Sequence, residues 1–360
     1  MAWYEWLAIL GGLAGLAGGT AALAAFMRLR RTQRTLARTA QLRRDSGQID
    51  RVAVVANPSK NGYADFKRAA HAMCDELGLG APLWLETTIE SPGGAQAARA
   101  AMEPGVRTVV AAGGDGTVRA VAEGLSGTGV PMGIVPLGTA NLLARNLKLP
   151  LVSNREALEV ALTGNRRLID VGRLSAWTAQ GEMVVDHETF LVISGLGFDA
   201  AMVSGADSAL KRRLGWPAYF ISGFNHLADK PVRVRFHGDH GVKAVLARSV
   251  MFGNCGLLPA RLNLVPDADL ADGKLDLAMV ETRHGLVGWA ALAFQVVLHS
   301  VGIRFTPAWA SGRMIYRQAQ SFRVACETEQ LIQIDGELVG RAAGMHAWVE
   351  HLALCVRVAS

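Results

Sequence analysis

The sequence has few cysteines, and their spacing is not that of metal ligands. The four cysteines lie far apart in 360 residues, at Cys74, Cys255, Cys326 and Cys355, without a CxxC or Cys/His pattern. A structural zinc site needs such a pattern, so we expect none, and scattered cysteines are typical of reduced thiols in a cytoplasmic environment. The nine histidines also lack an HExxH or paired spacing.

Charge is sparse as well, at 19% of residues, whereas 50% are hydrophobic. This composition excludes a disordered chain, and 360 residues exceed the usual size of one hydrophobic core. The net charge of +6 is uneven, because seven arginines and one acidic residue fall within residues 1–44, which leaves 30 basic and 30 acidic residues in the body. Nucleic-acid recognition needs a basic face on the folded body, so we expect no nucleic-acid partner.

A run without charges extends from Trp6 to Met27. About 20 apolar residues cross a bilayer as a helix. Glu5 precedes the run and arginines follow it, which is unlike a cleaved signal peptide. We predict that residues 1–50 are a membrane anchor with a basic juxtamembrane linker, and that the protein is single-pass in the cell membrane with a cytoplasmic body. The alternative is a buried helix of a soluble protein.

Within this run, Gly11, Gly15 and Gly19 recur every four residues. Small residues at this spacing allow two membrane helices to approach closely. A homodimer is therefore one prediction, and a span that the glycines merely loosen is the other.

The body changes character near residue 172. Before it, strand-like and helix-like runs alternate, which predicts an α/β domain over 51–172 with a parallel sheet and helices on both faces. The expected strands are 51–56, 83–87, 108–112, 133–136 and 167–171. After it, strand-like runs predict a β-rich antiparallel domain over 173–360. These runs are 189–194, 232–236, 244–252, 262–265, 275–280, 321–325, 331–334 and 347–358, with helices expected at 206–229 and 286–299.

Two glycine-containing corners follow expected strands. Gly113-Gly114-Asp115-Gly116-Thr117 ends one strand and opens a helix, where backbone N–H groups can approach a phosphate. Asp115 would repel bare phosphate, so it indicates a metal ion between carboxylate and phosphate; the alternative is a helix cap. Residues 136–141 (PLGTAN) form the second corner one unit later. Open α/β sheets bind ligands in a crevice at such strand ends.

These corners belong to a longer series of motifs that resembles the diacylglycerol kinase catalytic family, which includes bacterial lipid kinases and the sphingosine and ceramide kinases. The motifs occur in the family's order, and they are NPSKNG (57–62), AAGGDGTV (111–118), PLGTAN (136–141), LID (168–170), GLGFDA (195–200), DADLADGKLD (267–276) and QIDGE (333–337). The resemblance implies a nucleotide-binding α/β domain, like that of NAD kinases, followed by a β-rich lipid-binding and catalytic domain.

The resemblance also implies that ATP binds in the crevice with Mg²⁺. The implied nucleotide-binding residues are Asn57, Thr87, Gly113, Gly114, Asp115, Gly116, Thr117, Thr139 and Asn141. Lys60 is either a phosphate contact or a solvated loop residue, because family members usually place the basic residue of this loop differently.

Asp335 lies between an apolar strand and Gly336, which locally predicts a hairpin. In the family, this aspartate is the proposed general base that accepts the proton of the lipid hydroxyl, and Glu337 supports it. One carboxylate for the metal (Asp115) and one for the hydroxyl suffice for phosphoryl transfer. Asp115 as the base is the alternative; we favour Asp335.

The loop 267–276 contains four aspartates and a glycine, a composition that suits a hard cation. Resemblance to bacterial members implies a structural Mg²⁺ on the Asp272 side chain and the backbone of Asp269 and Lys274; the alternative is a solvated turn. Asp170 either accepts hydrogen bonds from the water molecules around the metal, or is a capping aspartate that accepts backbone hydrogen bonds. Asp199 aligns near the lipid head group of sphingosine kinases, or else it caps a helix.

The sequence thus predicts a membrane-anchored lipid kinase that uses ATP and Mg²⁺ to phosphorylate diacylglycerol or a similar membrane lipid. Two alternatives stay open. One is a kinase of a soluble acceptor, because NAD kinases and phosphofructokinases share a GGDG corner. The other is a non-catalytic nucleotide-binding membrane scaffold.

Overall fold

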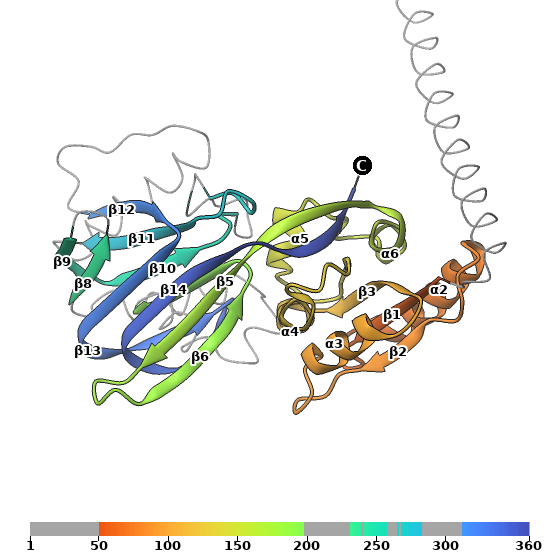
Figure 1. The fold of residues 1–360 in the computed structure, drawn as a ribbon, viewed down its shortest axis with the longest axis horizontal. Coiled ribbons are helices and arrows are strands. Elements are labelled where there is room, and N and C mark those ends of the chain that lie inside the picture. Colours follow the sequence, from red (N-terminus) through yellow and green to blue (C-terminus); the bar gives the residue numbers. More distant parts are fainter. Residues whose placement is uncertain are drawn as a thin grey trace, which may run out of the picture.

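The computed structural model describes residues 50–197, 231–238, 241–257, 265, 268–282 and 312–359. Its first part is a parallel sheet in the order β2-β1-β3-β4 (Figure 1). The strands are β1 (Arg51–Ala56), β2 (Leu83–Glu86), β3 (Val106–Gly113) and β4 (Met132–Pro136). The helices are α2 (Tyr63–Glu76), α3 (Gly94–Met102), α4 (Asp115–Leu125), α5 (Leu142–Asn146) and α6 (Asn154–Thr163).

Alternation of buried side chains along β1 explains why helices cover both faces of this sheet. Ala53 and Val55 belong to the core cluster that contains buried residues of α3 and α4. Val54 and Ala56 belong to the cluster that contains buried residues of α2 and α6. Successive side chains of a strand point to opposite faces, so a strand that is apolar on both faces needs two layers of helices. The predicted α/β architecture is confirmed, except that the expected strand 167–171 lies in a longer strand that pairs antiparallel with later strands.

The second part is built from antiparallel strands. They are β5 (Asn165–Trp177), β6 (Met183–Phe190), β7 (Ile193–Gly197), β8 (Val232–Gly238), β9 (Gly241–Ala247), β10 (Ser249–Gly253), β11 (Leu275–Thr282), β12 (Gly312–Ala319), β13 (Ser321–Ile334) and β14 (Glu337–Val358). All pairings among these strands are antiparallel. The predicted β-rich antiparallel architecture is confirmed for the part of the chain that the structure describes, except that the predicted strand 244–252 is divided at Arg248 into β9 and β10.

The last strand, β14, connects the two parts. It pairs with β13 at its beginning and with β5 along most of its length, and Val356 pairs in parallel with Met132 of β4. β5 continues without a break from Asn165 to Trp177, across the boundary predicted at residue 172. Two paired strands, rather than a loop, therefore connect the α/β part to the β-rich part (Figure 1).

The structure corrects the predicted strand at 189–194. β6 ends at Phe190 and β7 begins at Ile193, and the backbone between them departs from the strand ladder. The N–H groups of Leu191, Val192 and Ile193 instead donate to the carboxylate of Asp335. A long-range contact therefore ends one strand and starts the next.

The predicted strands 321–325 and 331–334 are parts of a single strand, β13. Its register against β14 shifts between Ala325 and Gln330, which marks a bulge or irregularity. A bulge disrupts the pairing locally without ending the strand, and the polar residues within it resemble a loop in the sequence.

Several predictions concern residues outside the described ranges. These are the anchor and linker over 1–50 apart from Asp50, the expected helices 206–229 and 286–299, the expected strand 262–265 apart from Val265, and Asp199. Among the described residues, no helix combines the length and apolar character needed to cross a membrane.

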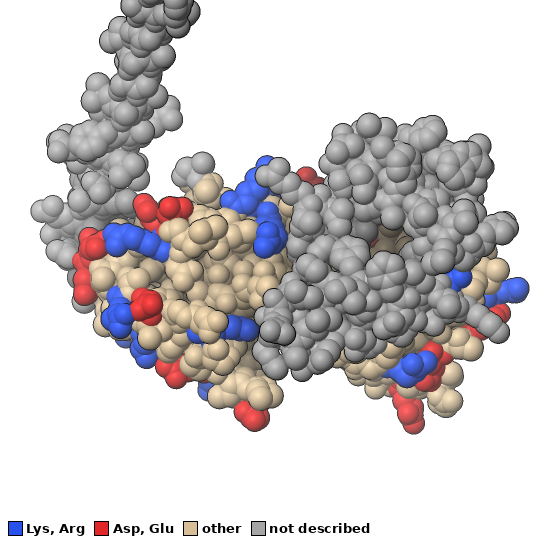
Figure 2. All heavy atoms as spheres, turned by 180° about the vertical axis from the view of Figure 1, so that it is seen from behind, with Lys and Arg blue, Asp and Glu red and all other residues tan. Residues whose placement is uncertain are grey.

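Charged side chains of both signs are interspersed on the described surface of the α/β part (Figure 2). Lys and Arg residues there lie among Asp and Glu residues, separated by uncharged surface. Residues of one sign do not form a continuous patch on the visible face. This distribution agrees with the neutral composition of the body after residue 44.

Candidate active site

Four parallel strands end at one edge of the sheet and bring predicted nucleotide-binding residues together there. Just past these strand ends, the N–H of Thr87 donates to Ala56 O at 2.9 Å and that of Asn57 donates to Ala112 O at 3.0 Å. The N–H of Leu137 donates to Gly113 O at 2.9 Å. The loops that follow β2, β1, β3 and β4 therefore leave the sheet side by side.

The first glycine corner joins β3 to α4. A Cβ atom on Gly113 would lie 2.5 Å from Oγ1 of Thr117, so only glycine fits. α4 begins at Asp115, and the first N–H groups of a helix have no partner within it. These groups and the helix dipole favour an anion at this corner. The backbone thus has the form that the sequence predicts for a phosphate cradle.

The second glycine corner packs directly on the first. A Cβ on Gly138 would lie 2.6 Å from the Cα of Gly114. Asn141 has a left-handed backbone (φ 48°), and its side-chain amide donates to Gly138 O at 2.7 Å. The buried Asn141 side chain therefore shapes the corner, whereas Thr139 is exposed.

Asp115 ties the two corners together. Its carboxylate accepts hydrogen bonds from the N–H groups of Asn141 (2.9 Å) and Leu142 (2.6 Å). Burial raises the pKa of Asp115, and these two hydrogen bonds act in the opposite direction. Each carboxylate oxygen can accept more than one hydrogen bond or cation contact, so the helix-cap interpretation and the metal interpretation are compatible.

Lys60 lies against the first corner. Its Nζ would be 3.7 Å from a Cβ on Gly114, and the side chain is half-buried. Among the described residues, no ion pair or hydrogen bond occupies its ammonium group. Asn57 holds the same loop, because its Oδ1 accepts from the N–H (3.0 Å) and the hydroxyl (2.7 Å) of Ser59. Of the two sequence interpretations of Lys60, this placement favours the phosphate contact.

The predicted hairpin forms at Asp335 and Gly336, which have φ values of 47° and 83°. Two residues with positive φ make the turn that Asp-Gly favours between antiparallel strands. The Asp335 side chain turns inward, where it accepts from the N–H groups of Leu191 (2.8 Å), Val192 (2.9 Å) and Ile193 (3.0 Å). Burial raises the pKa of Asp335 despite these bonds.

Glu337 begins β14 and reaches α4. Its Oε1 would be 2.9 Å from a Cβ on Gly116, and its Oε2 accepts from Arg119 at 2.5 Å. The Glu337 side chain is 57% exposed, in contrast to the buried Asp335. The β-rich part thus places an accessible carboxylate beside the first glycine corner. Arg119 was not singled out from the sequence, because its partner is 218 positions away.

The aspartate-rich loop is held by its own side chains. Asp269 Oδ1 accepts from the N–H of Ala271 at 2.9 Å, and Asp272 Oδ1 accepts from the N–H of Lys274 at 3.0 Å. Both aspartates are exposed. No described residue bonds the second oxygen of either carboxylate. Exposed carboxylates together with loop carbonyls are suitable ligands for Mg²⁺. Within the described ranges, no group of three or more His, Cys, Asp or Glu side chains could hold a metal ion, so such a site would rely on backbone oxygens.

Asp170 anchors this loop to the strands. Its buried carboxylate accepts from the N–H groups of Gly273 (2.7 Å) and Leu352 (2.7 Å) and contacts His351 Nδ1 at 2.8 Å. The fully buried position agrees with the capping interpretation.

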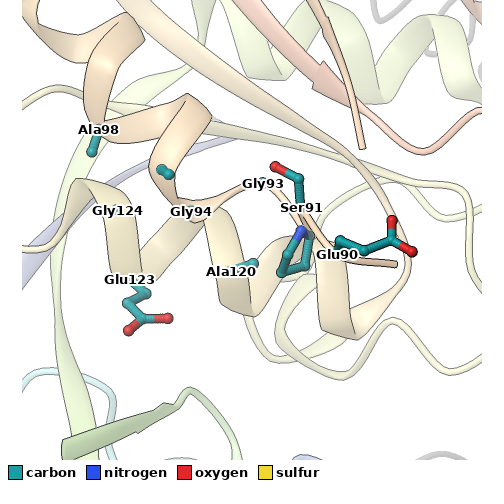
Figure 3. Close-up of a pocket in the computed structure, with 10 residues that line it drawn as sticks. Glu90, Ser91, Gly93, Gly94, Ala98, Ala120, Glu123 and Gly124 are labelled. Carbon is teal, nitrogen blue, oxygen red and sulfur yellow. The ribbon is translucent and has the colours of Figure 1, made fainter. Parts of the chain in front are cut away.

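A shallow pocket of about 400 Å³ lies between α3, α4 and the loop 90–94 (Figure 3). Glu90 and Glu123 line it, and no cationic side chain does. Two carboxylates without a cation would repel phosphate, so this pocket does not extend the phosphate cradle.

Comparisons with known proteins identify relatives of this chain. A family model described as the diacylglycerol kinase catalytic domain matches residues 51–174. A diacylglycerol kinase of Mycobacterium tuberculosis is 30% identical over 257 residues, which cover 67% of this chain and 76% of that protein. An uncharacterised protein of Synechocystis sp. is 27% identical over 241 residues, which cover 64% of this chain but only 50% of that protein.

A solved structure shares the fold. The crystal structure of a diacylglycerol kinase from Bacillus anthracis superimposes with a TM-score of 0.60 over 86% of this chain and 97% of that chain, at 16% identity. The arrangement of an α/β part followed by a β-rich part is therefore common to both proteins.

Proposed function

The chain belongs to the diacylglycerol kinase catalytic-domain family of lipid kinases, and we propose that it transfers the γ-phosphate of ATP to a hydroxyl group of diacylglycerol or a similar membrane lipid. The proposal rests on the close approach of the Glu337 side chain to Gly116. This approach puts an exposed carboxylate beside a helix N-terminus that is suited to phosphate. Phosphoryl transfer depends mainly on positioning and charge neutralisation, and this juxtaposition supports the positioning part of the proposal.

In this proposal, the nucleotide phosphates lie on the backbone of the first glycine corner, and Lys60 neutralises part of their charge. Asn57, Thr87 and Thr139 complete the nucleotide site from the neighbouring strand ends. The support is their common edge of the sheet and the approach of Lys60 to Gly114.

We assign the proton-accepting role to Glu337 rather than to Asp335. The Asp335 carboxylate is buried and accepts three backbone N–H bonds, so it holds the chain between β6 and β7. Glu337 has one oxygen bound to Arg119, and the other faces Gly116. A general base must come within hydrogen-bond reach of the hydroxyl it deprotonates, and only the exposed carboxylate meets this condition.

Mg²⁺ enters the proposal in two places. When bound with the nucleotide, it supplies charge neutralisation on the phosphates, and Asp115 is the carboxylate that would hold it there. A structural Mg²⁺ would be held by Asp272, with backbone oxygens of Asp269 and Lys274. The support is chemical, because both positions offer oxygen ligands of the kind that Mg²⁺ prefers.

We further propose that residues 6–27 anchor the protein in the cell membrane, with the catalytic body in the cytoplasm, and that their glycine spacing allows a homodimer. The support is the charge-free run followed by arginines. An anchor suits a substrate that stays in the bilayer, because it raises the effective concentration of the lipid at the enzyme.

The direct test is transfer of labelled phosphate from ATP by the full-length chain in detergent micelles. A panel of diacylglycerol, ceramide, sphingosine and NAD separates lipid from soluble acceptors. We expect labelled phosphate on a lipid, with Mg²⁺ required. Labelling of NAD alone would favour the soluble-acceptor kinase, and labelling of no acceptor would favour the non-catalytic scaffold.

A further inference from the structure

Arg119 links the two parts of the molecule at the candidate active site. It lies on α4, three residues after Gly116, and its guanidinium crosses to the hairpin between β13 and β14. Nη1 donates to the backbone O of Ile334 at 2.8 Å, and Nη2 donates to Oε2 of Glu337 at 2.5 Å. The Arg119 side chain is only 17% exposed, whereas that of Glu337 is 57% exposed, so the contact is desolvated mainly on the arginine side.

The charges around Arg119 are mainly negative. Its positive charge opposes the rise in the pKa of the buried Asp335. It also opposes the rise in the pKa of Glu123, which burial and the neighbouring Glu188 cause. The nearby Arg173 is bound to Glu350 at 3.0 Å. Among the described residues, Arg119 is therefore the cationic side chain that contacts the Glu337 carboxylate directly.

The geometry of a guanidinium matters here. Its planar fork donates to two acceptors at fixed relative positions, which a lysine ammonium cannot do. Binding Ile334 O and Glu337 Oε2 at once fixes the carboxylate relative to the turn. Oε2 is then occupied, and Oε1 is the oxygen that faces Gly116 and the phosphate corner.

We infer that Arg119 is a positioning residue, which orients Glu337 so that its free oxygen faces the lipid hydroxyl beside the bound phosphates. This inference rests on the proposed lipid-kinase function. Arg119 holds the base and does not itself contact the acceptor. Loss of the fork leaves a flexible carboxylate, and a misplacement of about 1 Å can lower a rate by roughly 100-fold.

The test compares full-length wild type with Arg119→Gln, Arg119→Lys, Glu337→Gln and the double variant Arg119→Gln/Glu337→Gln. Lipid phosphorylation in micelles gives kcat and the KM for Mg-ATP. Arg173→Gln is the matched control, because Arg173 is similarly buried and paired with a glutamate but does not contact the hairpin turn. Melting temperatures show which variants are folded.

We expect Arg119→Gln to lower kcat by about 10- to 100-fold, with the KM for Mg-ATP changed less than threefold. Arg119→Lys should recover only part of the loss. Adding Arg119→Gln to Glu337→Gln should cost little more, because residues that act as a unit are not additive. Arg173→Gln should leave kcat near that of wild type.

Three results would overturn the inference: an unchanged kcat in folded Arg119→Gln, a loss confined to KM, or full additivity in the double variant. If wild type itself phosphorylates no lipid, the proposed function fails, and the inference fails with it. Active wild type with an unaffected Arg119→Gln rejects the inference alone.

Discussion

At the residue scale, Lys60 provides a positive charge beside the first glycine corner. We predict that Lys60→Met weakens Mg-ATP binding by roughly 10- to 150-fold, because a charge-assisted hydrogen bond to phosphate is worth about 1.5–3 kcal/mol. Isothermal titration calorimetry measures the Kd. Lys67→Met is the matched control, since Lys67 pairs with Glu86 on the surface of α2. Equal Kd values for Lys60→Met and wild type would show that Lys60 is a solvated loop residue and does not contact the phosphates.

A second prediction at this scale separates Asp335 from Glu337. Asp335→Ala leaves three buried N–H groups without their acceptor, and each unpaired buried group costs about 1–3 kcal/mol. We therefore expect a clear loss in the free energy of unfolding, measured by urea denaturation, whereas Glu337→Gln should unfold near the wild-type midpoint. A stable Asp335→Ala variant with lost activity would instead support a catalytic Asp335.

His346 provides a pH-dependent prediction. It stacks on Trp348 with ring centroids 4.8 Å apart, and burial, together with the charges of Arg323 and His187, lowers its pKa. The unfolded chain therefore binds the proton more tightly, so the stability of the fold decreases as the pH falls through about 6.5, the ordinary histidine value. Urea denaturation between pH 8 and 5 should show a smaller decrease for His346→Gln. Equal decreases would contradict this assignment.

At the element scale, the prediction that the loop between residues 268 and 274 binds a structural Mg²⁺ can be tested by thermal unfolding. A ligand that binds only the folded state stabilises it by mass action. We expect Mg²⁺ to raise the melting temperature of the full-length chain, EDTA to reverse the effect, and Asp272→Ala to abolish it. Asp65→Ala is the control, because Asp65 is an exposed aspartate of α2 paired with Arg68. If neither Mg²⁺ nor Asp272→Ala changes the melting curve, the loop is a solvated turn that binds no structural Mg²⁺.

Local patterns sufficed for some elements and not for others. The strand 51–56 was predicted with the observed bounds, because a β-branched run is a local signal. The interruption between Phe190 and Ile193 could not be predicted, since its cause is a carboxylate 144 positions away from Leu191. The Arg119–Glu337 pair was missed for the same reason. The family resemblance favoured Asp335 as the base, and the burial of its carboxylate is not visible in the sequence; which carboxylate is the base stays a prediction.

At the scale of the whole molecule, the 14 strands among the described residues form one sheet that runs through both parts. β5 and β14 carry it from the α/β part to the β-rich part, and the hairpin before β14 brings Glu337 to α4. The residues proposed to bind phosphate thus come from the first part, and the proposed base comes from the second. The order of motifs in the sequence predicted both halves, and the structure shows the contact between them.

We propose that phosphate is transferred to a lipid hydroxyl where the first glycine corner meets Glu337. The most direct measurement is the rate of diacylglycerol phosphorylation in micelles by wild type and Glu337→Gln, with the Kd for Mg-ATP determined in parallel. Loss of a general base lowers rates by about 10²–10⁴-fold, so we predict an active wild type, a decrease of that size in the variant, and Kd values within threefold. An inactive wild type would contradict the lipid-kinase function, and a Glu337→Gln variant with the wild-type rate would contradict the role of Glu337 as the base.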